Sequence, residues 1–178
     1  MTQLITGIGI DFPPGIAVHD IVRQMIKDNW PTVNFTPLKK EVRFTDIGNH
    51  WNTNYQISTR QLPYEIRHST GSGNYQMVNA PVEINIWQRK VSLVRPKAID
   101  SMVNKVSEII QTNQRDLSTG MTAGTIATLA SGMDSIRMKT EFDEPGLDTI
   151  RVNLPSPGSS IQWHSQAFAD VWFFRYIA

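Results

Sequence analysis

The sequence contains no cysteine. This absence excludes disulfide bonds, thiol catalysis, and zinc or iron–sulfur sites built on cysteine ligands. The sequence also lacks a run of about 18 to 20 apolar residues, the length that a membrane-spanning helix needs. Its first ten residues have neither the basic stretch nor the apolar run of a signal peptide. We therefore expect a protein that is made in water and stays there.

Charged residues are scarce, at 19% of the 178 residues, and the formal net charge is only +1. A charge so close to zero disfavours wholesale nucleic-acid binding, which usually uses a clearly basic face. The hydrophobic share of 40% is ordinary, but 5 Trp, 4 Tyr and 7 Phe make the sequence aromatic. Few charges combined with many aromatics indicate either a large core or surface patches that partners cover.

No internal repeat and no linker divides the chain, and 178 residues is the length of one domain. Apolar residues from Val18 to Trp30 recur at helical spacing, which predicts a helix over 16–30 that Pro31 ends. A second helix is predicted over about 96–113, with Pro96 in its first turn. A short third helix at 125–130 is an alternative to a loop in the glycine-rich stretch 117–132.

Alternation of apolar and polar residues predicts the strands. The clearest is 80–89, where Val82, Ile84 and Ile86 alternate with polar residues. Shorter strands are predicted at 33–35, 41–44, 55–57, 136–142 and 148–154. The last segment, 166–177, is apolar on both faces, as is typical of a central strand. The order predicts one α+β domain, residues 1–178, whose mostly antiparallel or mixed sheet has the N-terminal helix and the 96–113 helix on one face.

No catalytic, cofactor or metal site is predicted. The four histidines, His19, His50, His68 and His164, share no metal-ligand spacing. The carboxylates between Glu141 and Asp148 surround a Pro-Gly turn and lack the spacing of an EF-hand. The glycine pairs 7–9 and 71–73 lack the ending of a phosphate-binding loop, and the serines near His164 lack a nucleophile motif.

Two basic clusters stand out, one at 39–43 and one at 89–97. The first holds Lys39, Lys40 and Arg43, and the second holds Arg89, Lys90, Arg95 and Lys97. With Trp87 nearby they are compatible with a nucleic-acid contact. Glu41 and Glu83 dilute them, so a solvated face is the simpler interpretation. A small nucleic-acid-binding accessory module is therefore the alternative function.

The second half resembles a known family. The strand Ala80–Trp87, the helix that starts near Pro96, and the aromatic closing segment Trp163–Tyr176, with a helix at 16–30 in front, resemble the tail-terminator and tail-completion (neck) proteins of long-tailed phages and archaeal tailed viruses. The resemblance implies a structural protein of the virion, present in the host cytoplasm during assembly, with no catalytic residues. It implies a homo-oligomeric ring, hexameric in the commonest case, that caps the tail tube and joins it to the head. The implied partners are tail-tube and connector proteins, and DNA would pass through the lumen of the ring.

A ring-building role would explain the low charge together with the abundant aromatics, because interface cores are depleted of charge and enriched in aromatics. The loops 46–56 and 114–132 are then the expected contact segments. The residues expected to contact partners are Trp51, Tyr55, Arg89, Lys90, Leu117 and Met121.

Overall fold

The computed structural model describes residues 15–46, 54–68, 75–89, 97–138, 151–153 and 162–176. These residues form the helices α2 (Val18–Asp28), α3 (Lys97–Thr112) and α4 (Thr125–Ser131), and a single 3-10 turn, η1 (Lys39–Glu41). The strands are β1 (Val42–Thr45), β2 (Tyr55–Gln61), β3 (Glu65–His68), β4 (Tyr75–Arg89), β5 (Ser135–Met138), β6 (Arg151–Asn153) and β7 (Gln162–Tyr176).

All seven strands belong to one sheet, in the order β1-β2-β4-β7-β5, with β3 also paired to β4 and β6 to β7. The β1–β2 pair is parallel and every other pair is antiparallel. At the centre, β4 and β7 pair over their whole length, from Tyr75 opposite Tyr176 to Arg89 opposite Gln162. The predicted α+β class with a mixed, mostly antiparallel sheet is confirmed, and so is the central position of the aromatic C-terminal strand.

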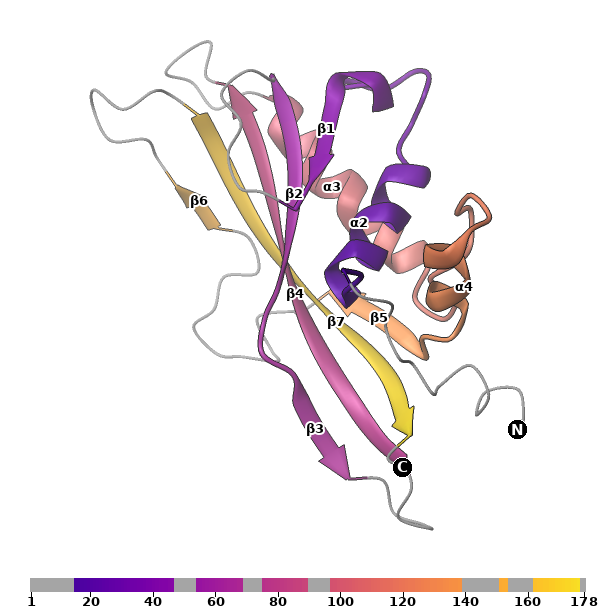
Figure 1. Ribbon diagram of the computed structural model, residues 1–178. Helices are drawn as coiled ribbons and strands as arrows, with labels where there is room; N and C mark the ends of the chain where they lie inside the picture. The colour runs from indigo at the N-terminus through magenta and orange to yellow at the C-terminus, as the bar shows by residue number, and fades with distance from the viewer. Residues whose placement is uncertain are drawn as a thin grey trace.

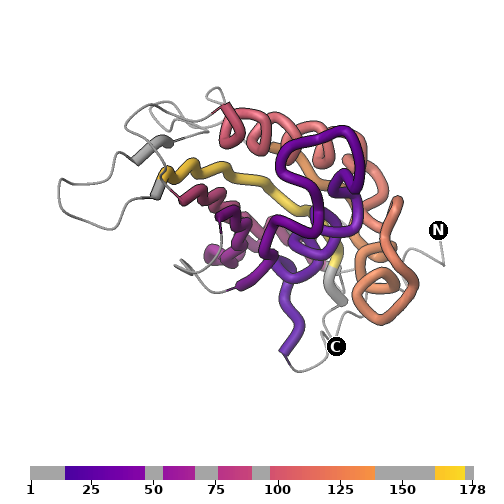
Figure 2. Tube along the Cα trace, turned by 90° about the horizontal axis from the view of Figure 1, so that it is seen from above, coloured from indigo at the N-terminus to yellow at the C-terminus, as the bar shows by residue number. Residues whose placement is uncertain are grey.

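The helices lie on one side of the sheet (Figure 1). Seen from above, α3 runs beside the strands and α4 lies near the periphery (Figure 2). Both α2 and α3 pack against β4, and α3 also packs against β5 and β7. We call the side of the sheet that carries α2 and α3 the helix side, and the opposite side the outer face. Since side chains alternate along a strand, the outer-face positions of β4 are Met77, Asn79, Pro81, Glu83, Asn85, Trp87 and Arg89.

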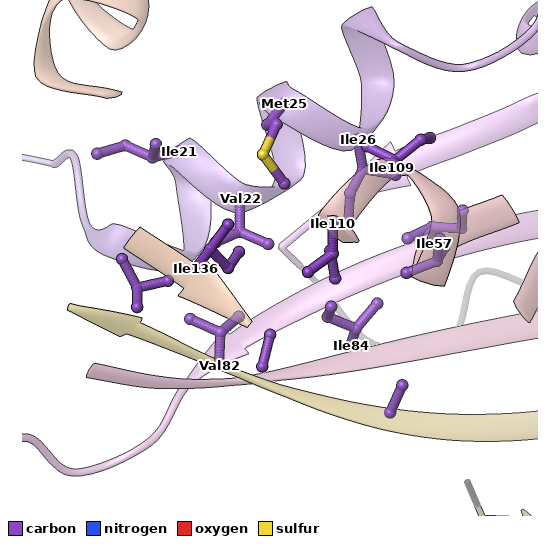
Figure 3. Close-up of a cluster of buried hydrophobic side chains, with 14 of the residues drawn as sticks. Ile21, Val22, Met25, Ile26, Ile57, Val82, Ile84, Ile109, Ile110 and Ile136 are labelled. Carbon is purple, nitrogen blue, oxygen red and sulfur yellow. The ribbon is translucent and has the colours of Figure 1, made fainter. Parts of the chain in front are cut away.

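The hydrophobic core fills the space between the helices and the helix side of the sheet (Figure 3). From α2, the side chains of Val22 and Met25 point at Val82 and Ile84 of β4, while Ile110 of α3 closes the cluster (Figure 3). All five side chains are fully buried. Burying one such side chain contributes about 1.5–3 kcal/mol, so this layer holds the helices on the sheet. The buried residues of α3, which are Ile99, Met102, Val103, Val106, Ile109 and Ile110, are those whose spacing predicted the helix.

Most of the predicted elements are confirmed. The helices predicted at 16–30 and 96–113 correspond to α2 and α3, and the strand predicted at 80–89 is the second half of the longer β4. At 125–130, where a helix and a loop were both open, the structure has the helix α4. The strand predicted at 33–35 is wrong. Asn34 has a φ of 53°, which no strand accommodates, and Phe35 turns inward so that its ring meets Trp30 edge-on at 5.6 Å between centroids. The aromatic contact therefore overrides the short alternation.

Several sequence features lie outside the described residues. These are His50, Trp51, Lys90, Arg95, both glycine pairs and the acidic stretch 141–148. None of the helices in the described ranges combines the length and the apolar character that crossing a bilayer requires.

Candidate functional site on the outer face

The outer face carries a chain of polar side chains that we call the outer-face cluster: Arg60, Glu83, Asn85, Trp87 and His164. They come from β2, β4 and β7, which are neighbours in the sheet. The register places Arg60 opposite Glu83, and Trp87 opposite His164. Side chains from three strands thus form one continuous chain of contacts on the outer face.

Glu83 is the anchor of the cluster. It is only 6% exposed, and its carboxylate accepts hydrogen bonds from Asn85, Gln166 and Arg60. Burial opposes its ionisation, but these three donors and the charge of Arg60 outweigh burial and lower the pKa of Glu83. A carboxylate saturated in this way holds a proton poorly, which suits anchoring of the guanidinium better than proton transfer.

The hydrogen-bond pattern fixes the tautomer of His164. The ionised Glu83 can only accept, so Nδ2 of Asn85 donates to its Oε1 at 2.7 Å. The amide oxygen of Asn85 then faces Nε2 of His164 at 2.6 Å, which requires that Nε2 carries the hydrogen. Burial lowers the pKa of His164, and the charge of Glu83 only partly opposes this. The neutral ring stacks on the indole of Trp87, with 3.7 Å between centroids and 7° between planes.

No protein-family model matches this sequence, and neither does any curated protein sequence. We therefore infer the function from the residues and their geometry.

The described residues contain no group of three or more His, Asp or Glu side chains able to hold a metal ion. His164 and Ser165 are neighbours in sequence, but alternation along β7 directs His164 to the outer face and Ser165 to the helix side. The described arrangement therefore does not bring these two groups together as a nucleophile and its base.

The residues expected to contact partners fall in different places. Arg89 is exposed at the end of β4, on the outer face. Tyr55 is half-buried at the start of β2 and packs against the core. Leu117 is fully buried within the core, and Met121 is half-buried against it. The side chain of Leu117 thus packs inside its own chain, while Trp51 and Lys90 lie outside the described residues.

The structure separates the members of the first basic cluster. Nζ of Lys39 lies 3.6 Å from Oδ1 of Asp28 at the end of α2. Burial opposes the ionisation of Asp28, but the backbone N–H of Thr122, the side chain of Gln24 and the charge of Lys39 together lower its pKa. Lys39 thus stabilises the fold locally. Arg43 instead stands on β1, exposed on the outer face.

Sequence reasoning missed the outer-face cluster as a unit. The alternation of Glu83 and Asn85 with apolar residues was visible, and it indicated a polar face. That this face would be joined to His164, far along the chain, depends on the register between β4 and β7, which no local pattern encodes.

Proposed function

We propose that this chain is a virion structural protein of the tail-terminator or head–tail neck type. In this role it forms a ring, with six copies expected, that caps the tail tube and joins it to the head. Its partners are further copies of itself together with tail-tube and connector proteins, and it resides in the virion after assembly in the host cytoplasm. The observation that carries the proposal is the end of the sheet that projects beyond the helices.

At that end, β3 and the adjoining ends of β4 and β7 extend past α2 and α3 (Figure 1). Among the described strands β3 pairs only with β4, so its other edge is a sheet edge. An edge strand presents N–H and C=O groups to which another chain can add. This geometry supports an assembly role.

The same end exposes apolar side chains. Tyr64 is 47% exposed and Ile66 is 53% exposed, and with Val33 they are the large apolar side chains that stand out at the surface of the described chain. The ring of Tyr64 meets Phe173 edge-on, at 6.4 Å between centroids, so it is held in place on β7. Exposed apolar groups next to a sheet edge are typical of a contact surface.

A contact between this end of one copy and a different surface of the next copy is head-to-tail, and such contacts close into rings when the rotation permits. The low overall charge is consistent with a chain that buries part of its surface in an assembly.

Native mass spectrometry of Ile66→Asp tests the proposal. We expect the wild-type protein to give a species of about six times the 20.2 kDa chain mass. Ile66→Asp places a carboxylate at the projecting end and should shift the population to smaller species. Val33→Asp is the matched control, because Val33 is 68% exposed and belongs to the segment between α2 and η1 instead of to β3. A monomeric wild-type protein at high concentration, or equal dissociation by the two variants, would contradict the proposal.

A further inference from the structure

Three exposed arginines lie along one half of the outer face, between the middle of β4 and the end opposite to the one that projects beyond the helices. Arg43 stands on β1, Arg60 on β2 and Arg89 on β4, and these three strands are adjacent. Arg43 lies opposite Gln56, which in turn lies opposite Trp87, so it shares a row with the Trp87–His164 pair. The fold thereby unites one arginine from each of the two basic clusters.

The strand register fixes the positions of the three arginines, and one of them is also held by a buried partner. Arg60 donates to the buried Glu83, yet 67% of its side chain remains exposed. Arg89 and Glu83 lie six residues apart on the same strand, so the arginine positions span about 20 Å along the sheet. Glu83 is already engaged by Arg60, and this end of the outer face is therefore net positive although the whole chain carries only +1.

Aromatic side chains continue along the same face. Phe168, Trp172 and Phe174 of β7 occupy outer-face positions, as Trp87 does on β4, and all four are partly exposed. These are the two central strands of the sheet. Sheet faces that carry aromatics on their central strands and arginines beside them bind unpaired bases by stacking, while the arginines bind the phosphates.

We propose that the outer face binds single-stranded nucleic acid, with Arg43, Arg60 and Arg89 on the phosphate backbone and the aromatic positions of β4 and β7 along the bases. The cations favour a polyanion over an apolar protein partner, because the described residues with large exposed apolar side chains, Val33, Tyr64 and Ile66, are not outer-face positions. The strands contain arginine and no lysine in the described part of the chain, and the planar guanidinium suits phosphate recognition. The proposal does not depend on ring formation.

Fluorescence anisotropy with a labelled 20-nucleotide oligo-dT tests the proposal, over a series of salt concentrations beginning at 50 mM. The double variant Arg43→Ser/Arg89→Ser should weaken binding at least tenfold. It should also reduce the slope of log K against log salt by about 1.4, since each phosphate contact to a single strand contributes about 0.7. Phe168→Leu keeps the apolar bulk and removes the stacking surface, so it should weaken single-strand binding with a smaller change of salt slope.

The matched control is Lys27→Ser/Arg115→Ser, which removes two exposed positive charges, one on α2 and one just after α3, and should leave binding within about threefold. Circular dichroism checks that every variant is folded. The proposal would be overturned by an absence of oligo-dT binding at 50 mM salt, or by equal weakening of that binding in the two double variants. It would also be overturned if a 20-base-pair duplex bound as tightly as oligo-dT. A fourth contrary result is that Arg43→Ser/Arg89→Ser loses self-association while its oligo-dT binding is unchanged. The last result would assign the face to a protein contact.

Discussion

Trp87 and His164 stack face to face across the two central strands of the sheet, with 3.7 Å between ring centroids. The register places them directly opposite each other, and Asn85 holds Nε2 of the imidazole. His164 is only 8% exposed, so a positive charge on its imidazole ring would lose hydration. The outer-face cluster is therefore sensitive to acid.

We predict that acid destabilises the protein through His164. Its pKa in the fold lies below the ordinary 6.5, so the unfolded chain binds this proton at a higher pH than the folded chain. Stability is thus fully present above about pH 6.5 and falls as the pH decreases below it, by at most about 1.4 kcal/mol per pH unit. Urea unfolding at pH 7.5 and 5.5 should show this loss in wild type and in His19→Gln, and less of it in His164→Gln. An equal loss in His164→Gln would assign the acid sensitivity to other groups.

Removal of Glu83 should cost more than removal of its partner. Glu83→Ala leaves the buried amide of Asn85 without its acceptor, and we expect a loss of about 1–3 kcal/mol in the free energy of unfolding. Arg60→Ala should cost less, because the side chain of Arg60 is largely exposed. Urea denaturation of both variants at pH 7 checks the order, and a larger loss in Arg60→Ala would contradict the anchoring role of Glu83.

Truncation in the core layer should be severe. Ile84 is fully buried between β4 and the helices, and Ile84→Ala should lower the free energy of unfolding by about 2–5 kcal/mol. Val33→Ala is the control, since Val33 is 68% exposed and its truncation should stay within about 0.5 kcal/mol. Thermal and urea unfolding measure the stability of both variants. Similar losses in the free energy of unfolding would contradict the position of Ile84 in the core.

Gly120 should not tolerate a side chain. Its φ is +73°, and an added Cβ would lie 2.2 Å from Oδ1 of Asn29. The side-chain amide of Asn29 donates to the carbonyl oxygens of Met25 and Thr119, which ties the end of α2 to the 117–121 segment. Gly120→Ala should therefore cost more than the roughly 1–2 kcal/mol of left-handed backbone strain alone.

Gly15→Ala isolates the strain, because Gly15 also has a positive φ, +87°, but apart from its chain neighbours no heavy atom of the described residues lies within 4 Å of the added Cβ. The difference between the two alanine variants in urea unfolding measures the clash with Asn29. Adding Asn29→Ala to Gly120→Ala should recover part of that difference, and a failure to do so would place the cost in the backbone.

The spacing of apolar residues predicted the helices and the central strands, because an element that buries one face repeats its apolar residues at the period of that helix or strand. The spacing from Ile99 to Ile110 identified the buried face of α3, and the two-sided apolar texture of 166–177 identified a central strand. The strand prediction for 33–35 failed because the aromatic contact between Phe35 and Trp30 and the left-handed backbone of Asn34 decide the path of this segment. Three residues of alternation carry too little information to compete with such contacts.

The candidate site was not predictable to the same degree. The sequence singled out Trp87 and Arg89 as candidate contact residues. Their position on one face with Arg43, Arg60 and His164 follows from the strand order and register. Likewise, the exposure of Tyr64 and Ile66 depends on β3 extending beyond the helices, and the sequence alone does not set where the helices end relative to the sheet.

Negative-stain electron microscopy of the purified wild-type protein tests the proposed assembly role most directly. We expect class averages of closed rings with an open centre and one dominant number of subunits. Ile66→Asp should abolish these rings and Val33→Asp should preserve them. A field of single 20.2 kDa chains at every protein concentration, in a sample that is folded by circular dichroism, would contradict the assembly role.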